Sequence, residues 1–308
     1  MPNLPVAAIG LPFDPNISGG SSFALSWHGF LSFVAVAVAV WLVARAARSE
    51  PGVTADMVYN TAIWAIIGGI IGARIVHVAD FWDVYSNDLL SIFSVWEGGI
   101  GLWGGILGGW LAGITYAYIV KYPVGKLMDI TAAPLLLAQT IGRIGDIING
   151  EHWSRATDLP WGWYFTHPAS PARIGAERDY GNPEEPVHPA VVYEMIWNII
   201  GLFLLYKLRH RLKPDGSLFM FYLAYYSLGR FMVQFVRLDK VYFANLQEAH
   251  LIAIGVFVIT VPFLAIKTRF RKPGEAPESP SPDDTDENGS TGRRRHERRE
   301  RRARAKAN

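Results

Sequence analysis

The sequence predicts an all-α integral membrane protein with seven transmembrane helices and a small external head segment. Half of its 308 residues are apolar. They come in blocks of about 20 residues, which is the length that a helix needs to cross a hydrocarbon core. Because backbone groups in lipid must pair within their own segment, we expect each block to be a helix. Most charged residues lie between the blocks, so the chain is not expected to fold as a soluble protein.

The predicted spans are joined by short polar connections, with one longer exception. They cover residues 25–44, 58–79, 98–120, 128–150, 189–206, 217–236 and 250–266. The longer connection, about 151–188, is predicted to form the external head. Residues 1–24 are expected to be an external N-terminal segment, without a cleaved signal peptide because no basic region precedes the first apolar run. The transmembrane domain is then expected to cover residues 25–272.

The basic residues predict the orientation of the spans. Clusters of Lys and Arg follow the first, third, fifth and seventh spans, at positions 45, 48, 121, 126, 207–213 and 267–272. The connection 81–97 has no Lys or Arg, and 239–247 has only Lys240, whereas the head is an exception with three arginines. By the positive-inside rule the N-terminus is predicted to lie outside and the C-terminus in the cytoplasm.

The last 36 residues, 273–308, have a composition that cannot form a core. Pro, Glu, Asp and Ser are followed by the run RRRHERRERRARAK. We expect a disordered, charged cytoplasmic tail. The basic run could contact anionic lipid, and a solvated tail without a specific role is the alternative.

Several kinds of chemistry are excluded or unsupported. The chain has no cysteine, so a disulfide, a thiolate metal site and a cysteine nucleophile are impossible. The histidines are not in HExxH spacing, no acidic cluster resembles a site for a hard cation, and no Walker or dinucleotide motif occurs in a strand–helix context. We therefore expect no metal, no cofactor and no nucleic-acid partner.

The fourth span ends in a polar stretch, QTIGRIGDIINGEHW, at residues 139–153. Gln139, Arg143, Asp146 and Gly150 fall on one face of a helix at this spacing. An arginine at membrane depth costs about 2.5–3.5 kcal/mol on insertion scales. Its charge should therefore hold an anion or be paired inside the protein. The predicted topology puts this stretch in the outer third of the membrane.

Arginines from two other parts of the chain reach the same predicted depth. Arg74 lies near the outer end of the second span, and Arg230 and Arg237 lie in the outer part of the sixth. Arg74 could instead pair with Asp80, and Arg237 could extend to the membrane interface. Such an extension explains Arg230 poorly, because Arg230 lies about two turns deeper.

Other motifs have both a structural and a functional interpretation. The glycine run that opens the third span presents small-xxx-small ridges that let helices pack closely, while Gly98 and Gly99 could leave room for a ligand. His28 is either a hydrogen-bonded structural residue or a proton acceptor. Glu194 either braces the fifth span or takes part in chemistry.

The residues around Arg143 resemble a known signature. GRIGDIINGE at 142–151 is similar to GRxGNFxNxE of the bacterial prolipoprotein diacylglyceryl transferases. Further matches follow in the family's order: GAR at 72–74, WEGGI at 96–100, HPxxxYE at 188–194, and RFxVQ at 230–234 followed by an arginine at 237. The resemblance covers most of the chain from about residue 27 to 272.

The resemblance implies a seven-span transferase of the bacterial cytoplasmic (inner) membrane. Such an enzyme moves the diacylglyceryl group of phosphatidylglycerol to the lipobox cysteine thiol of a preprolipoprotein, the first step of lipoprotein maturation. The implied partners are phosphatidylglycerol, preprolipoprotein signal peptides and the lipid bilayer. Arginines at headgroup depth suit a phosphodiester, and they would stabilise charge on the departing phosphate. The acceptor thiol, with an ordinary pKa of about 8.5, needs a base or a positive field.

The resemblance also implies roles for residues. Arg143 is the first candidate to hold the phosphate and Arg230 the second, and either Glu151 or His28 would be the base for the thiol. These four are the expected catalytic residues. The expected contacts of phosphatidylglycerol are Arg143, Asp146, Asn149, Arg74, Arg237, Gly98 and Gly99.

The chain departs from the family's pattern at four positions. His28 stands where tyrosine is usual, Trp103 where histidine is, Asp146 where asparagine is, and Gln234 where glutamate is. One interpretation is compensation, in which the carboxylate lost at Gln234 reappears at Asp146. The alternative function is a non-catalytic or repurposed relative that binds phospholipid or lipoprotein. A transporter is not favoured, since no inverted repeat or broken-helix pair is seen.

Overall fold

The structure, a computed structural model, describes residues 8–17, 26–94, 98–99, 101–151 and 154–272. The predicted charged tail, residues 273–308, lies outside the described residues. So do most of the predicted N-terminal segment, and Trp153 at the end of the polar stretch.

Seven helices of 18 residues or more make up most of the described chain, and each overlaps one predicted span. They are α1 (Trp27–Ala47), α2 (Ala55–Asp80), α4 (Leu102–Ile119), α5 (Val124–Asn149), α7 (Ala190–Leu208), α8 (Ser217–Gln234) and α9 (Glu248–Lys267). By length and composition, α1, α2, α7 and α9 can cross a membrane. Helix α4 is rich in glycine, whereas α5 and α8 carry polar residues within their lengths.

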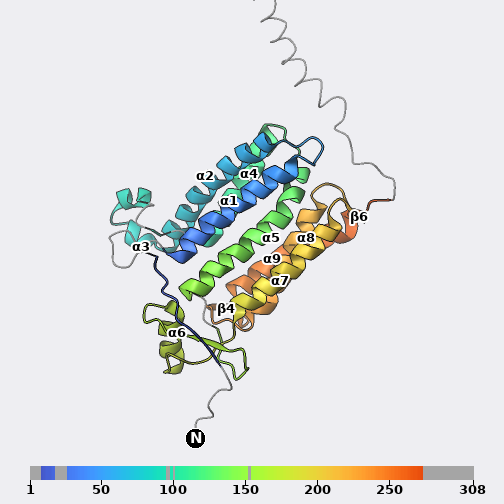
Figure 1. Cartoon of the computed structure of the whole chain (residues 1–308). Helices are drawn as coiled ribbons and strands as arrows, with labels where there is room; N and C mark the ends of the chain where they lie inside the picture. The colour runs from blue at the N-terminus through green and yellow to red at the C-terminus, as the bar shows by residue number, and fades with distance from the viewer. Residues whose placement is uncertain (1–7, 18–25, 95–97, 100, 152–153, 273–308) are drawn as a thin grey trace, which may run out of the picture.

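Helix α5 lies in the middle of the bundle (Figure 1). On one side it packs against α1, beside which lie α2 and α4, and on the other side it packs against α7 and α8, with α9 against α8. One buried cluster, which includes Val43 and Leu127, joins α5 to the first group. A second, which includes Leu136, Leu205 and Phe219, joins it to the other. Side chains of α5 can therefore reach both halves of the bundle.

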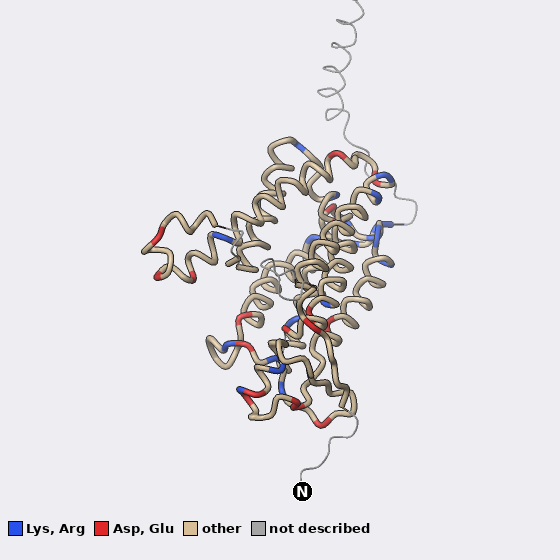
Figure 2. The backbone as a smooth tube through the Cα atoms, turned by 60° about the vertical axis from the view of Figure 1, so that its left-hand side comes forward, with Lys and Arg blue, Asp and Glu red and all other residues tan. Residues whose placement is uncertain are grey.

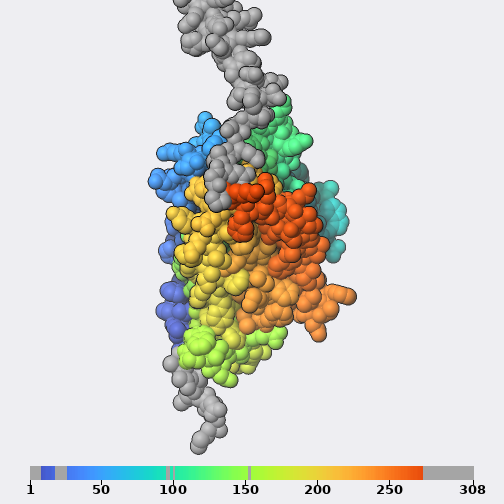
Figure 3. All heavy atoms as spheres, turned by 90° about the vertical axis from the view of Figure 1, so that its right-hand side faces the viewer, coloured from blue at the N-terminus to red at the C-terminus, as the bar shows by residue number. Residues whose placement is uncertain are grey.

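The outer surface of the bundle is apolar. Exposed branched and aromatic residues follow one another along the helices, as in α2 with Ile63, Ile67, Ile70, Ile71 and Ile75. Figure 3 shows the face formed by α7, α8 and α9, with the head below it. Exposed apolar residues of these helices include Ile199, Phe203 and Val258. Soluble proteins rarely expose apolar patches of this size, and a hydrocarbon environment accounts for them. The structure is thus that of a mostly helical membrane protein.

Helices α2 and α4 make backbone contact through glycines. A Cβ atom added at Gly72 would overlap the Gly104 carbonyl oxygen and lie 2.9 Å from the Gly108 Cα. A Cβ at Gly108 would likewise overlap the carbonyl of Gly68. The structure confirms the packing interpretation of the glycine run at these positions.

The head lies at one end of the bundle, beyond the C-terminal end of α5 (Figure 1). Strand β1 (Ile9–Leu11) pairs in parallel with β2 (Trp163–Phe165), and α6 (Pro171–Tyr180) packs beside them. The N-terminal segment thus forms part of the head. The Arg155 amide donates 2.8 Å to the Val236 carbonyl, which fixes the head to the end of α8.

Two further pairs of short strands lie in the segments that follow or connect α7, α8 and α9. Strand β3 (Leu212–Lys213) pairs antiparallel with β6 (Arg269–Phe270), at the end of the bundle away from the head. Strand β4 (Val241–Phe243) pairs with β5 (Leu246–Gln247) between α8 and α9.

An arm after α2 contains α3 (Trp82–Tyr85) and the 3-10 helix η1 (Leu89–Phe93), and it projects from the bundle (Figure 1). Arg74, near the end of α2, anchors this arm. Its guanidinium donates to the carbonyls of Ser91 (2.5 Å), Ile92 (2.7 Å), Gly98 (2.8 Å) and Gly99 (2.9 Å). Within the described residues Arg74 binds backbone carbonyls, and it forms no ion pair with Asp80.

The substitution Gly72→Ala should lower the stability of the bundle, because the new Cβ forces α2 away from α4. We expect a cost of about 1–3 kcal/mol, as for overpacking in other cores, seen as a lower Tm of the detergent-solubilised protein. Gly255→Ala in α9 is the matched control, since a Cβ there meets nothing within 4 Å. An equal Tm for the two variants would contradict the close packing.

Candidate active site

The polar stretch ends α5 beside the start of α1. Gly150 terminates α5 in the left-handed conformation, with φ of 63°, which costs glycine little. Ser26 caps α1 by accepting a hydrogen bond from the Gly29 amide at 3.1 Å. Gly145 lets the two helices approach, because a Cβ there would lie 2.9 Å from the His28 Cα. These local features bring the first turn of α1 onto the last two turns of α5.

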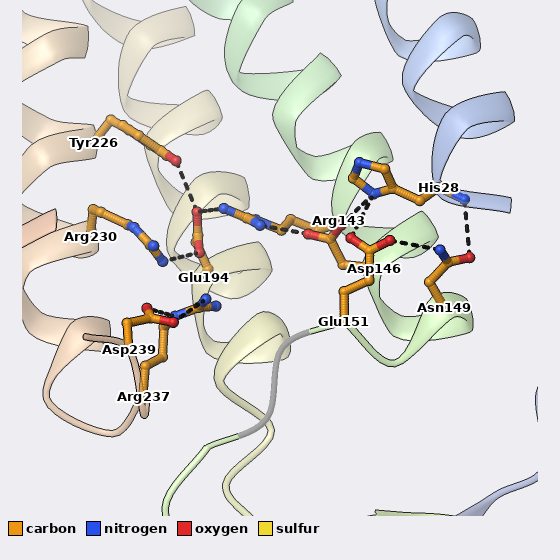
Figure 4. Close-up of polar contacts among 10 residues, drawn as sticks. All are labelled: His28, Arg143, Asp146, Asn149, Glu151, Glu194, Tyr226, Arg230, Arg237 and Asp239. Carbon is orange, nitrogen blue, oxygen red and sulfur yellow. Dashed lines mark hydrogen bonds and ion pairs between the residues drawn. The ribbon is translucent and has the colours of Figure 1, made fainter. Parts of the chain in front are cut away.

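His28 lies against two carboxylates at this junction (Figure 4). Its Nδ1 is 2.6 Å from Asp146 Oδ1 and 3.6 Å from Glu151 Oε2. Asn149 accepts from the His28 amide at 3.3 Å and donates 2.7 Å to Glu151. Asp146 and Asn149 are buried, whereas the His28 side chain is 40% exposed. One imidazole nitrogen is therefore held by a buried carboxylate while the ring stays accessible.

Arg143 continues this network into the other half of the bundle. Its Nη1 lies 2.5 Å from Asp146 Oδ2, and its Nη2 lies 2.7 Å from Glu194 Oε1. Glu194, on α7, is 1% exposed, and it also accepts from the Tyr226 hydroxyl at 2.9 Å and faces Arg230 Nη1 at 3.4 Å. Positive and negative groups alternate from α1 to α8 (Figure 4).

Arg237 belongs to a neighbouring cluster at the end of α8. Its guanidinium lies 3.0 Å from Asp239 Oδ2. Gln234, fully buried, donates to the same Asp239 oxygen at 2.6 Å and to Gln247. Partial burial alone would raise the pKa of Asp239. The charge and hydrogen bond of Arg237, with smaller contributions from Gln234 and Arg230, together outweigh it and lower that pKa below its usual range. Arg237 is thus paired within the protein and is 4% exposed.

The structure brings together most, but not all, of the residues predicted for the site. His28, Arg143, Asp146, Asn149, Glu151 and Arg230 form one connected network. Arg74, Gly98 and Gly99 contact one another at the base of the arm instead. Trp103 lies half-buried in the first turn of α4. Within the described residues, none of these four makes a polar contact with the network.

Two of the four departures from the family pattern contact each other. Asp146 faces His28, whereas Gln234 faces Asp239 and Gln247. Asp146 and Gln234 therefore lie in separate clusters, which does not support compensation between them. The geometry supports a different pairing, in which histidine and aspartate together replace tyrosine and asparagine.

The central position of Glu194 was not expected from the sequence. It contacts both arginines and Tyr226, yet the sequence left its role open between a brace and a chemical group. The available signal was an acidic residue in an otherwise apolar helix, since such residues within a membrane span usually pair. Asp239 was missed because it lies in a polar connection where carboxylates are common.

Three side chains of the network have the arrangement of possible metal ligands. His28 Nδ1 and single oxygens of Asp146 and Glu151 lie within 4.8 Å of one another, close enough to share an ion. The sequence predicted no metal because the histidines lack HExxH spacing and no acidic cluster resembles a site for a hard cation. However, Arg143 already places a positive charge 2.5 Å from Asp146, and it would compete with a bound cation for this carboxylate.

Comparisons with known proteins agree with the resemblance seen in the motifs. The sequence profile of the family described as "Prolipoprotein diacylglyceryl transferase" matches residues 17–266. Similar curated proteins are named phosphatidylglycerol–prolipoprotein diacylglyceryl transferase. One from Thermosynechococcus vestitus is 34% identical over 75% of this chain and 84% of its own length. One from Trichormus variabilis is 33% identical over 85% and 92%. The transferase 1 of Streptomyces coelicolor is 32% identical over 88% and 78%.

The matched region includes every helix of the bundle except the last residue of α9, and with it all members of the polar network. The chain therefore belongs to the prolipoprotein diacylglyceryl transferase family.

Proposed function

We propose that this protein transfers the diacylglyceryl group of phosphatidylglycerol to the cysteine thiol of a preprolipoprotein lipobox. The names of its relatives state the lipid donor and the reaction. The observation that carries the proposal is the network of His28, Asp146, Arg143, Glu194 and Arg230 at one end of an apolar bundle. It combines a proton acceptor with two guanidinium groups, which are the two things that the reaction requires.

The seven long helices are proposed to be seven spans of the bacterial inner membrane, with the N-terminus and the head outside and the C-terminus in the cytoplasm. The positive-inside rule supports this orientation. Figure 2 shows Lys and Arg at the end of the bundle away from the head, while the head has both basic and acidic residues. The network then lies near the outer leaflet, where phosphatidylglycerol and an exported signal peptide can meet.

The phosphodiester of phosphatidylglycerol is proposed to bind between Arg143 and Arg230. Guanidinium groups bind phosphate through paired N–H donors. Glu194 is the only ion-pair partner of Arg230 within the described residues, at the long distance of 3.4 Å, so this arginine can turn toward a lipid. Arg143 is held more firmly and gives the site a fixed positive charge.

His28 is proposed to accept the thiol proton. Its Nδ1 is engaged by Asp146, which leaves Nε2 for the substrate, as in catalytic groups where a carboxylate orients an imidazole. Glu151, 3.6 Å from the same ring, adds negative charge that stabilises the imidazolium. Asn149 holds Glu151 in place.

The transfer is a displacement at carbon. The thiol loses its proton to His28, and the sulfur forms a bond to the glycerol carbon that carries the phosphate. The bond from this carbon to the phosphate oxygen breaks, and its electron pair leaves on glycerol phosphate, which then receives the proton. Charge grows on the departing phosphate, so arginines fixed beside it stabilise the transition state more than the bound lipid.

Replacement of a depleted host enzyme tests the proposal directly. The gene should restore growth and thioether-linked diacylglycerol on lipoproteins when the host's own transferase is removed. Protein that accumulates in the membrane while lipoproteins stay unmodified would refute the proposal and would favour a non-catalytic relative.

Arg143→Ala should lower the transfer rate at least 10²–10³-fold, because one fixed donor for the departing charge is lost. The rate is measured with phosphatidylglycerol vesicles and a lipobox peptide. Arg143→Lys should be intermediate, since the charge remains without the planar fork, and it keeps the test valid if the alanine variant is unstable. Arg178→Ala, at an exposed arginine of the head, is the control and should stay active. Full activity of Arg143→Ala would remove this residue from the mechanism.

His28→Tyr and Asp146→Asn should each lower the rate, by at least about tenfold, whereas the double variant should be more active than either. Each single change leaves an unmatched partner, and the double change restores the pair usual in the family. A double-mutant cycle measures the coupling.

The matched control for this cycle combines His28→Tyr with Gln234→Glu, which lies in the other cluster. It should show no rescue. Losses that simply add in the His28 and Asp146 cycle would contradict the coupling.

Prolonged dialysis against EDTA should leave the transfer rate unchanged. The proposed steps use only the side chains named above, and Arg143 occupies the carboxylate that a cation would need. Loss of activity that returns with added divalent metal would assign His28, Asp146 and Glu151 to a metal site instead.

A further inference from the structure

A cavity of about 360 Å³ lies at the opposite end of the bundle from the network. It is bordered by the C-terminal turns of α1 and α7 and by the first half of α5. Asp129 at its rim and Arg143 in the network are 14 residues apart on α5, which corresponds to about 21 Å. The cavity is therefore separate from the site already described.

The cavity has an apolar interior and a polar mouth. Leu42, Leu137, Leu202 and Leu205 line its inner part. On α5 the lining runs from Lys126 to Leu137, 11 positions that span about 16 Å along the helix. A ligand that matches this cavity has a polar group at one end, for the mouth, and a hydrocarbon chain at the other, for the apolar interior.

Three arginines lie at the mouth of the cavity. Arg45 is in the last turn of α1, Arg209 follows α7, and Arg271 follows β6. Within the described residues, the side chains of Arg45 and Arg209 make no hydrogen bond or ion pair to a carboxylate. The Nε of Arg271 is buried without a hydrogen-bond partner in the same part of the chain. These guanidinium groups from three segments therefore offer unused donors to one ligand.

The carboxylates at the mouth do not cancel this charge. Asp129 accepts from the amides of Gly216 (2.8 Å) and Phe219 (2.9 Å), so it serves the start of α8. Glu50 lies 3.7 Å from His210 Nδ1. Asp215 is exposed to solvent. The lining thus holds four cationic side chains, Arg45, Lys126, Arg209 and Arg271, and three carboxylates, which leaves one positive charge in excess.

We propose that this cavity binds one anionic phospholipid of the cytoplasmic leaflet. The phosphate would bind Arg45, Arg209 and Arg271, and an acyl chain would lie along Leu42 and Leu202. Charge complementarity argues for an anion. The apolar wall argues for a lipid, because a charged peptide has no long apolar group to place against it. The leaflet rests on the orientation given under the proposed function, but the site does not depend on the reaction.

Native mass spectrometry of the full chain tests the proposal, with dioleoyl phosphatidic acid as the probe and dioleoyl phosphatidylcholine as the neutral comparison. The triple variant Arg45→Gln, Arg209→Gln and Arg271→Gln should lose one bound phosphatidic acid per chain, or bind it at least tenfold more weakly. Its matched control changes Arg48, Arg211 and Arg269 to glutamine. These lie at the same end and do not line the cavity, and the control should bind like the unchanged protein.

A second variant removes the space and leaves the charge. Ala133→Phe places a ring in the cavity, which Ala133 lines, and it should lose the same lipid. Arg143→Ala should keep it. The proposal is overturned if both cavity variants bind phosphatidic acid like the unchanged protein, or if phosphatidylcholine binds equally well. It also fails if lipid binds only after removal of residues 273–308, since the cavity would then belong to the tail.

The transfer assay is scored separately. An inactive protein that still holds this lipid would refute the proposed function alone. An active protein without it would refute this inference alone.

Discussion

The placement of two partly buried arginines around the buried Glu194, between apolar helices, is the constraint on which the rest of the bundle depends. Arg143 and Arg230 come from different helices, and Glu194 from a third lies between them. Removal of one partner of a buried ion pair typically costs about 3–5 kcal/mol, because the other charge is left unpaired. The register of α5, α7 and α8 is therefore fixed by electrostatics as well as by packing. Asp146 extends the same constraint to α1 through His28.

The balance of charge in this network bears on how a lipid phosphate enters it. Arg143 and Arg230 are matched by Asp146 and Glu194, and Glu151 adds a further negative charge. In the proposed lipid complex, a phosphodiester has to displace a carboxylate from a guanidinium, at least in part. The weakest contact is that of Arg230 with Glu194, at 3.4 Å. Pairing within the protein lowers the free-energy cost of charged groups at membrane depth. The donor that a phosphate can reach most readily is the one in the loosest pair, Arg230.

The sequence was sufficient for the positions of the long helices, because apolar blocks, glycine ridges and the polar end of α5 are local features. It also placed Arg143 and Asp146 on one face of a helix, three residues apart, and in the structure these side chains form an ion pair. It could not predict that Arg74 would bind loop carbonyls, because their positions depend on how the arm folds. The pairing of His28 with Asp146 joins residues 118 positions apart and required the packing of α1 on α5.

The departures from the family pattern have different meanings once their neighbours are known. Four independent changes would suggest that the site has lost its catalytic function. Two of them, His28 and Asp146, instead form one contact. A carboxylate beside an imidazole is the arrangement that the proposed proton transfer uses. Gln234 donates to a carboxylate from Asp239, so the end of α8 keeps an acid beside Arg237. The polar side chains of the site are therefore redistributed among neighbouring positions, which a comparison of single positions would hide.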